Sequence, residues 1–151
     1  MTLIKVNNRG QKDNLGRRNL IINGAMQVAQ RGTQTGQGAS NAYSAVDRFQ
    51  ITSTGTNGRL TSSQSTDAPA GFANSLQLVC TTADTSIASS EFNRIRHKIE
   101  GQNLQHIEKG TSGAKPLTLS YHAKASTGGV IIVEIQDNDN NRLSSVAHTI
   151  T

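Results

Sequence analysis

The chain has 151 residues, enough for one domain with a buried core, and it carries a formal net charge of +5. Only 34% of its residues are hydrophobic and 17% are charged, and it has two prolines and no tryptophan. Disordered chains usually combine high charge with many prolines, and this chain has neither. Its single cysteine excludes an intrachain disulfide framework. The uncharged polar composition favours an all-β fold, with a flexible stalk as the alternative.

Basic residues concentrate in residues 1–18, which we predict to be an extended N-terminal arm. Five basic residues against Asp13 give this segment a charge of +4 and leave +1 for residues 19–151. They are Lys5, Arg9, Lys12, Arg17 and Arg18. So short a polar segment needs a partner to become ordered, because it buries too little apolar surface to offset its conformational entropy. Nucleic acid is disfavoured as that partner, since the arm has no aromatic residue for base stacking and the body has no basic stripe.

Between residues 19 and 65, alternating patterns predict short strands separated by one loop. Leu20 to Val28 alternates around Asn23-Gly24, which indicates two short strands or one bent strand. Gly32 to Ser44 mixes glycines with polar residues and predicts a loop. Residues 47–52 and 58–65 return to strand-like alternation, and the second of these strands is the weaker one.

Residues 66–108 predict a turn, two strands and a helical turn. A turn over 66–71 precedes a strand in which Leu76, Leu78 and Cys80 share a face, with the Cys80 thiol buried. Residues 92–99 admit a helix, but a strand is preferred because basic and apolar residues alternate there. The basic row is Arg94, Arg96 and Lys98, and the opposite row is Ile95, His97 and Ile99. Residues 102–108 can form one helical turn.

The last third predicts a β-hairpin. Residues 117–123 alternate, Thr127-Gly128-Gly129 supplies a turn, and residues 130–135 return as an apolar strand. A second turn at 137–141 leads into a strand-like run from Arg142 to Thr151. Phe49 and Tyr121 are predicted to lie in the core.

No residue pattern selects a catalytic or metal site. Asp137 to Asn141 begins like a calcium loop, but Arg142 stands where glycine is required and His148 where a bidentate glutamate is required, so a plain turn is favoured. The four histidines and Cys80 lack zinc-type spacing, and no Gly-x-Ser-x-Gly elbow is present. Glycoside hydrolysis needs two carboxylates at a set separation, and nothing selects such a pair. We therefore expect a protein that is not an enzyme and needs no cofactor.

One aromatic residue is a candidate for ligand contact. Tyr43 lies in the predicted loop ahead of Asp47, where it could contact a glycan. The alternative is that its ring simply fixes the loop to the sheet.

Four segments together resemble tail-fibre-like proteins of marine tailed phages. They are Asn19 to Thr33, which opens Asn-Leu-Ile-Ile-Asn-Gly, then Asp47-Arg48-Phe49, Ile99 to Leu104, and Lys115 to Tyr121. The resemblance implies an antiparallel jelly-roll-like β-sandwich of the carbohydrate-binding-module type over residues 19–151. In that family the sheet continues past the position of Thr151, so we expect the domain to be incomplete at its C-terminal end.

Several residues match the family's opening motif and are interpreted mainly as fold-specifying. The matching positions after the arm are Asn19, Asn23, Gly24, Arg31, Gly32, Asp47 and Arg48. The glycines are expected to meet turn geometry, and Arg31, Asp47 and Arg48 to form a charge-assisted network that holds the first strands to the sheet. An attachment site is the functional alternative for this network.

The resemblance and the basic arm together predict a structural virion protein of a tailed bacteriophage. The arm would attach a tail-fibre or appendage subunit to other virion proteins, and the β-domain would contribute to adsorption on host-surface glycans. Homotrimers are expected, with synthesis in the host cytoplasm before assembly. No apolar run approaches the ~18 residues of a membrane span and no secretory signal is present, so membrane insertion is not expected. A free carbohydrate-binding module is the alternative, and a polysaccharide depolymerase is a less favoured one.

Overall fold

The computed structural model describes residues 19–39 and 41–151, so the predicted arm lies outside the described residues. The described chain contains eight strands and one short 3-10 helix: β1 (Gln34–Gln37), β2 (Ala42–Tyr43), β3 (Phe49–Thr54), β4 (Arg59–Ser65), β5 (Ser75–Thr82), β6 (Phe92–His97), η1 (Gly101–Ile107), β7 (Gly129–Asp137) and β8 (Arg142–Ile150). Every strand pair is antiparallel, which confirms the all-β antiparallel fold. The chain forms two compact units, one ending at Lys115 and the other spanning Pro116–Thr151.

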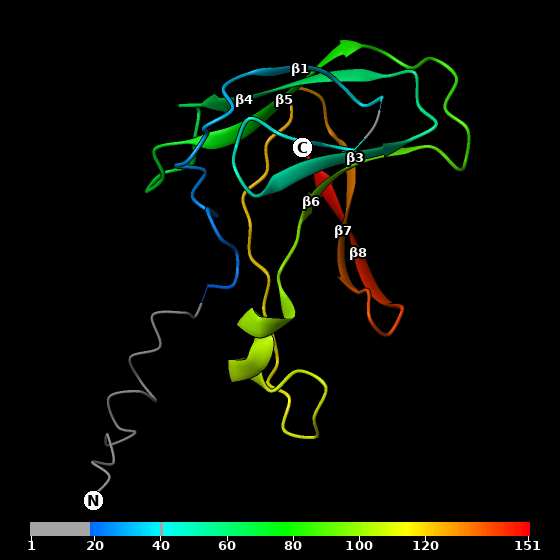
Figure 1. Cartoon of the computed structure of the whole chain (residues 1–151). Coiled ribbons are helices and arrows are strands. Elements are labelled where there is room, and N and C mark those ends of the chain that lie inside the picture. Colours follow the sequence, from blue (N-terminus) through cyan, green and yellow to red (C-terminus); the bar gives the residue numbers. More distant parts are fainter. Residues whose placement is uncertain (1–18, 40) are drawn as a thin grey trace, which may run out of the picture. The chain divides into compact units, whose positions relative to one another are not determined.

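The first unit contains two three-stranded sheets. Their strand orders are β1-β4-β5 and β2-β3-β6, and the two sheets lie one above the other (Figure 1). The core residues Val46 and Ile51 are 0% and 1% exposed. The backbone N–H of Ala45 donates to Oγ of the fully buried Ser62 at 2.9 Å, which ties the β2–β3 connection to β4 of the other sheet. A buried polar side chain is therefore satisfied at the junction of the sheets.

Strand register assigns each side chain of the β2-β3-β6 sheet to one of two faces. Phe49 pairs with His97 and Ile51 with Ile95, so these four side chains share the face on which the core lies. The opposite face carries the intervening residues, including Arg94 and Arg96. The predicted alternation of residues 92–97 is confirmed. Ile95 is nevertheless 52% exposed, because β6 is the last strand of its sheet.

Residues 20–28 do not form the predicted strands. Asn23 and Met26 both adopt left-handed backbone conformations, with φ of 60° and 55°, and the Met26 N–H donates to the Asn23 carbonyl at 2.9 Å. A strand requires extended backbone, so two left-handed residues close together exclude a ladder here. This segment is a turn followed by irregular chain.

The predicted loop over residues 32–44 instead contains β1 and β2. Gly36, inside β1, has a φ of +65°, and the register between β1 and β4 shifts between Gln34 and Gln37. Gly38 has a φ of +119°, and a Cβ atom there would lie 2.7 Å from the Gly58 carbonyl oxygen. The glycines thus permit an irregular strand and a close backbone approach, and do not mark a loop alone.

The remaining elements of the first unit form close to their predicted positions, with corrections at β3, β6 and Cys80. Strands β4 and β5, the turn over 66–71 and the helical turn at η1 form at these positions. β3 begins at Phe49 and not at Asp47, because Asp47 and Arg48 form a turn in which Arg48 has a φ of 76°, and β6 ends at His97 and not at Ile99. Cys80 was predicted to be buried but is exposed. It lies near the end of β5, the last strand of its sheet, where neighbouring side chains give little cover.

A carboxylate links the connection after β3 to the one after β5. The Asp84 carboxylate accepts hydrogen bonds from the Thr56 hydroxyl at 3.0 Å, from the Asn57 N–H at 2.8 Å and from the Ser86 N–H at 3.0 Å. These bonds favour the charged form and lower the pKa of Asp84, the Ser86 N–H having the largest effect.

The second unit is a long hairpin of β7 and β8 with an extended segment alongside it. The two strands pair through nine residues each, and the turn between them, with Asn141 at φ 49°, is the predicted turn. The predicted hairpin between residues 117–123 and 130–135 is wrong, because residues 117–125 form no strand. Strand β7 takes β8 as its ladder partner, since the 137–141 turn brings the two strands into immediate register.

Apolar side chains remain exposed over the second unit. Val130 and Ile132 are each 65% exposed and Val146 is 55% exposed. Tyr121, predicted to lie in the core, is 42% exposed. A two-stranded hairpin has no second layer of its own with which to bury both of its faces.

No helix among the described residues has the length and apolar character required to cross a membrane.

Candidate functional site

The two halves of the sequence motif meet at one corner of the first unit, around the Asn23 side chain. Its Nδ2 donates to the carbonyl oxygens of Val28 at 2.9 Å and Asp47 at 3.0 Å, and its Oδ1 accepts from the Val28 N–H at 3.0 Å. The Asp47 N–H in turn donates to the Val28 carbonyl at 3.0 Å. One amide side chain thus joins the opening segment to the residue that precedes β3 by two positions.

The other motif residues of the opening segment have local roles. Asn19 Oδ1 accepts from the Ile21 N–H at 2.9 Å. Gly24 lies close to Ile21, and the left-handed residues of this segment are Asn23 and Met26, not Gly24. Gly32 has a φ of +62°, as a turn glycine should.

The expected charge network divides into two separate ion pairs. Arg31 Nη1 lies 2.8 Å from Asp47 Oδ1, but Arg48 lies 2.6 Å from Glu100 Oε1. Arg48 also donates to the Lys98 carbonyl, so it joins the start of β3 to the end of β6. The Arg48 guanidinium lowers the pKa of Glu100 by donating a hydrogen bond to its carboxylate.

His97 lies at the same end of the first unit. Its ring contacts Phe49 edge-on with centroids 5.1 Å apart, and Nε2 lies 3.2 Å from the Ile22 carbonyl oxygen. Burial lowers the pKa of His97, because the charged form loses hydration. The motif residues and His97 therefore close this end of the unit structurally.

Tyr43 lies on the face of the β2-β3-β6 sheet that is opposite to the core, which we call the outer face. The Arg31 guanidinium lies over its ring, 4.9 Å from the centroid, and Tyr43 remains 48% exposed. The sequence predicts a loop at this residue, but Tyr43 lies on the short strand β2. The Asp47 carboxylate orients Arg31, so the ring and the guanidinium form an ordered pair at the surface.

Two more strands extend the outer face beyond Tyr43. Strand register places Gln50 opposite Tyr43, and Arg96 opposite Gln50, in one row across the sheet. In the adjacent rows Arg94 lies over the Phe92 ring, 4.1 Å from its centroid. The outer face therefore combines exposed aromatic rings, on which a ligand can stack, with an amide and guanidinium groups, which can form hydrogen bonds with a polar ligand.

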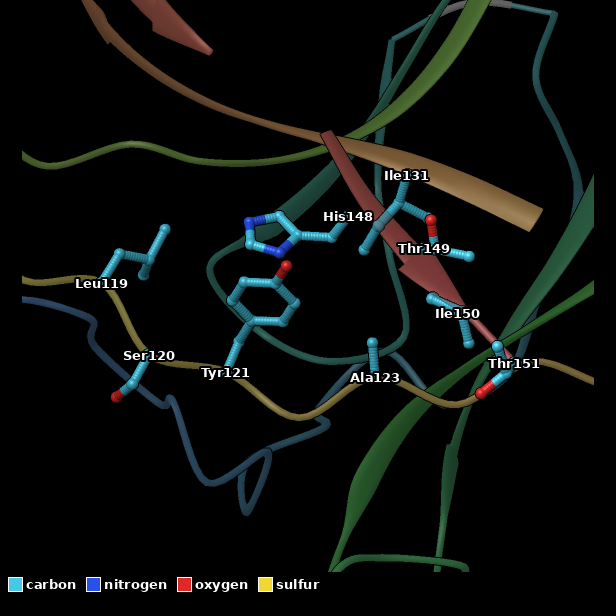
Figure 2. Close-up of a pocket in the computed structure, with 9 residues that line it drawn as sticks. All are labelled: Leu119, Ser120, Tyr121, Ala123, Ile131, His148, Thr149, Ile150 and Thr151. Carbon is cyan, nitrogen blue, oxygen red and sulfur yellow. The ribbon is translucent and has the colours of Figure 1, made fainter. Parts of the chain in front are cut away.

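The second unit contains an open groove of about 500 Å³ between the extended segment and β8 (Figure 2). In Figure 2 the Tyr121 and His148 side chains point toward each other, and their rings meet edge-on with centroids 5.7 Å apart. The groove is lined by Leu119, Ser120, Tyr121, Ala123, Ile131, His148, Thr149, Ile150 and Thr151. These residues include no side-chain carboxylate, so the groove offers no carboxylate pair for glycoside hydrolysis.

Across the described part of the chain, no three or more His, Cys, Asp or Glu side chains are grouped in a way that could hold a metal ion. The five basic residues predicted to anchor the arm lie outside the described residues. Comparisons with protein-family models, with curated proteins and with solved structures gave no match. The choice of candidate site therefore depends on the geometry of the side chains alone. The outer face has the arrangement best suited to binding a ligand.

Proposed function

We propose that this chain is a non-enzymatic structural subunit of a tailed-phage tail fibre or surface appendage. Its β-domain, of jelly-roll type, would contribute to adsorption on host-surface glycans. The basic residues of the arm would attach it to other virion proteins, so its location would be the virion.

The observation that carries the proposal is the assembly of the motif. Asn23 and Asp47 lie 24 residues apart, and both belong to segments that resemble phage tail-fibre-like proteins. They meet through a direct hydrogen bond and through Val28, which contacts both of them. The motif residues, which lie in separate segments of the sequence, thus form one structural unit. This is what we expect if the resemblance reflects a shared fold.

The exposed apolar hairpin supports a role in an assembly. Val130 and Ile132 are neighbours on the same face of β7, and each is 65% exposed. Contiguous exposed apolar surface marks sites of association with other proteins. Fibre subunits are commonly homo-oligomers, and a homotrimer is the oligomeric state that we propose.

The test is whether the chain is present in purified particles and whether residues 1–18 hold it there. Phage particles purified by density gradient should contain the chain, and a variant lacking residues 1–18 should fold but be lost from the particles. A far-UV circular dichroism spectrum of the variant that still indicates β-structure provides the folding control. A variant that assembles as efficiently as the full chain would contradict the anchoring role, and absence of the full chain from particles would contradict the virion role.

A free glycan-binding module is a second candidate, favoured by the exposed pair of Tyr43 and Arg31. It differs from the first candidate in predicting glycan binding by a chain that never joins a particle. Calorimetric titration with host polysaccharides, together with the particle assay, separates the two. Flat heats with every host polysaccharide would remove this candidate.

A further inference from the structure

We propose that the outer face of the β2-β3-β6 sheet binds an acidic polysaccharide, with Tyr43 as the stacking platform and Arg96 as the contact for a sugar carboxylate. The inference rests on the proposed function in adsorption and specifies the chemical class of the glycan. It goes beyond a general affinity for sugars because it requires negative charge on the ligand.

The Arg96 guanidinium on the outer face is available to an anionic ligand. Among the described residues, no side chain or backbone group forms an ion pair or hydrogen bond with its guanidinium. Each of the two arginines of the motif corner, in contrast, has its own carboxylate partner. A guanidinium is always charged and presents a planar fork of donors that matches a carboxylate. Arg96 is only partly exposed, so it would gain more from an anion than a fully hydrated lysine would.

The spacing of the side chains on the outer face fits a chain of sugars. Tyr43, Gln50 and Arg96 lie in one row on three adjacent strands, so the outer two are separated by roughly 10 Å of sheet. The ring of one sugar could stack on the face of the Tyr43 ring that the Arg31 guanidinium leaves open, while the carboxylate of a neighbouring sugar reaches Arg96. The Gln50 amide could form hydrogen bonds with hydroxyl groups between them. Arg94 follows Arg96 on the same face, about 7 Å further along β6.

The charge distribution of the described chain favours a polysaccharide over a nucleic acid as the ligand. Residues 19–151 have a formal charge of only +1, so the positive charge of the outer face is local. Nucleic acids carry a phosphate on every nucleotide and are usually bound along an extended basic surface. A polymer with widely spaced carboxylates fits a row of one aromatic residue, one amide and one guanidinium better.

The experiment is calorimetric titration of the full chain with polygalacturonate, with alginate, and with polygalacturonate whose carboxylates are fully methyl-esterified. The ester keeps the sugar backbone and removes the charge. We expect binding to at least one acidic polymer, and this binding should weaken as the salt concentration is raised. If polygalacturonate is bound, its ester should bind at least ten-fold more weakly.

Two variants and a matched control locate the binding to the outer face. Arg96→Gln should weaken binding to the acidic polymer roughly ten-fold, and Tyr43→Ala should weaken it at least as much. Arg142→Gln makes the same change of charge on β8 in the second unit and should bind as the original chain does. Unchanged melting temperatures would show that the variants are folded.

Four results would overturn the inference: no binding to either acidic polymer, equal affinity for the ester and for a polygalacturonate that does bind, affinity for poly(dT) equal to that for the acidic polymer, or equal effects of Arg96→Gln and Arg142→Gln. Equal affinity for poly(dT) would indicate a general polyanion surface. Particle association of the Arg96→Gln chain, measured separately, reports on the proposed function. If that chain still joins particles while acidic polymers fail to bind, the inference fails and the structural role stands.

Discussion

Replacement of Asn23 by alanine should destabilise the first unit more than any ordinary surface substitution. The side chain makes three hydrogen bonds, two to Val28 and one to the Asp47 carbonyl, and only the last of these is partly buried. At about 0.5–1 kcal/mol for each partly exposed bond, their loss costs roughly 2 kcal/mol. Alanine at a φ of 60° adds about 1 kcal/mol of backbone strain, which gives a total of about 3 kcal/mol.

The assay is thermal unfolding followed by far-UV circular dichroism. For a unit of this size about 1 kcal/mol corresponds to roughly 4 °C, so Asn23→Ala should lower the melting temperature by roughly 12 °C. Asn23→Gly loses the same hydrogen bonds but adopts the left-handed conformation freely, so it should be milder by about 1 kcal/mol. Asn138→Ala, in the exposed turn of the second unit, should change stability by less than about 0.5 kcal/mol.

Two outcomes would refute this reasoning. A melting temperature for Asn23→Ala within about 2 °C of the original chain would mean that the corner contributes little to the stability of the unit. Equal losses for the alanine and glycine variants would mean that the left-handed backbone is not the origin of the additional cost.

Two further predictions concern the connections of the first unit. Gly38→Ala should lower the free energy of unfolding by about 2 kcal/mol, because its Cβ would lie 2.7 Å from the Gly58 carbonyl oxygen. Gly36→Ala, whose Cβ meets nothing within 4 Å, should lower it by about 1 kcal/mol because of the positive φ of Gly36. Equal losses for the two variants in urea unfolding would contradict the close approach at Gly38. The folded-state pKa of Asp84 lies below its unfolded value of 3.8, so its hydrogen bonds stabilise the fold above pH 3.8 and this contribution is lost as the pH falls through the folded-state pKa. Asp84→Asn should therefore be less stable than the original chain at pH 7, and the difference should shrink below pH 3.8; a difference that does not vary with pH would exclude this origin.

The strands that could be predicted from the sequence are those whose side chains alternate between apolar and polar, as in β3, β4, β5 and β6. The row of Arg94 and Arg96 on one face of β6 followed from this alternation, although the partner of β6 is the distant strand β3. β1 and β2 were missed, because their glycine and polar composition is typical of a loop and their strand conformation depends on pairing with β4 and β3.

The candidate site was predictable only as separate residues. The sequence identified three of its residues, Tyr43, Arg31 and Asp47. It did not predict that the Arg31 guanidinium lies over the Tyr43 ring and is held by the Asp47 carboxylate. These contacts form only when the chain folds back and brings the opening segment next to β2. Arg48 is predicted to join the same network because it belongs to the same motif. It contacts Glu100 instead, because β3 pairs with β6 and brings the two residues together across 52 positions.

The amino-acid sequence by itself determined the all-β class, the approximate positions of β3 to β8 and the turns at 66–71 and 137–141, because these depend on local backbone preferences and on side-chain alternation. Only the tertiary structure decided which strands pair, which faces are buried and which charges meet. The last third shows the difference most clearly, since residues 117–123 alternate as a strand should but β7 pairs with β8. Ladder pairing is a competition among all extended segments of the chain, and local alternation carries no information about which partner wins.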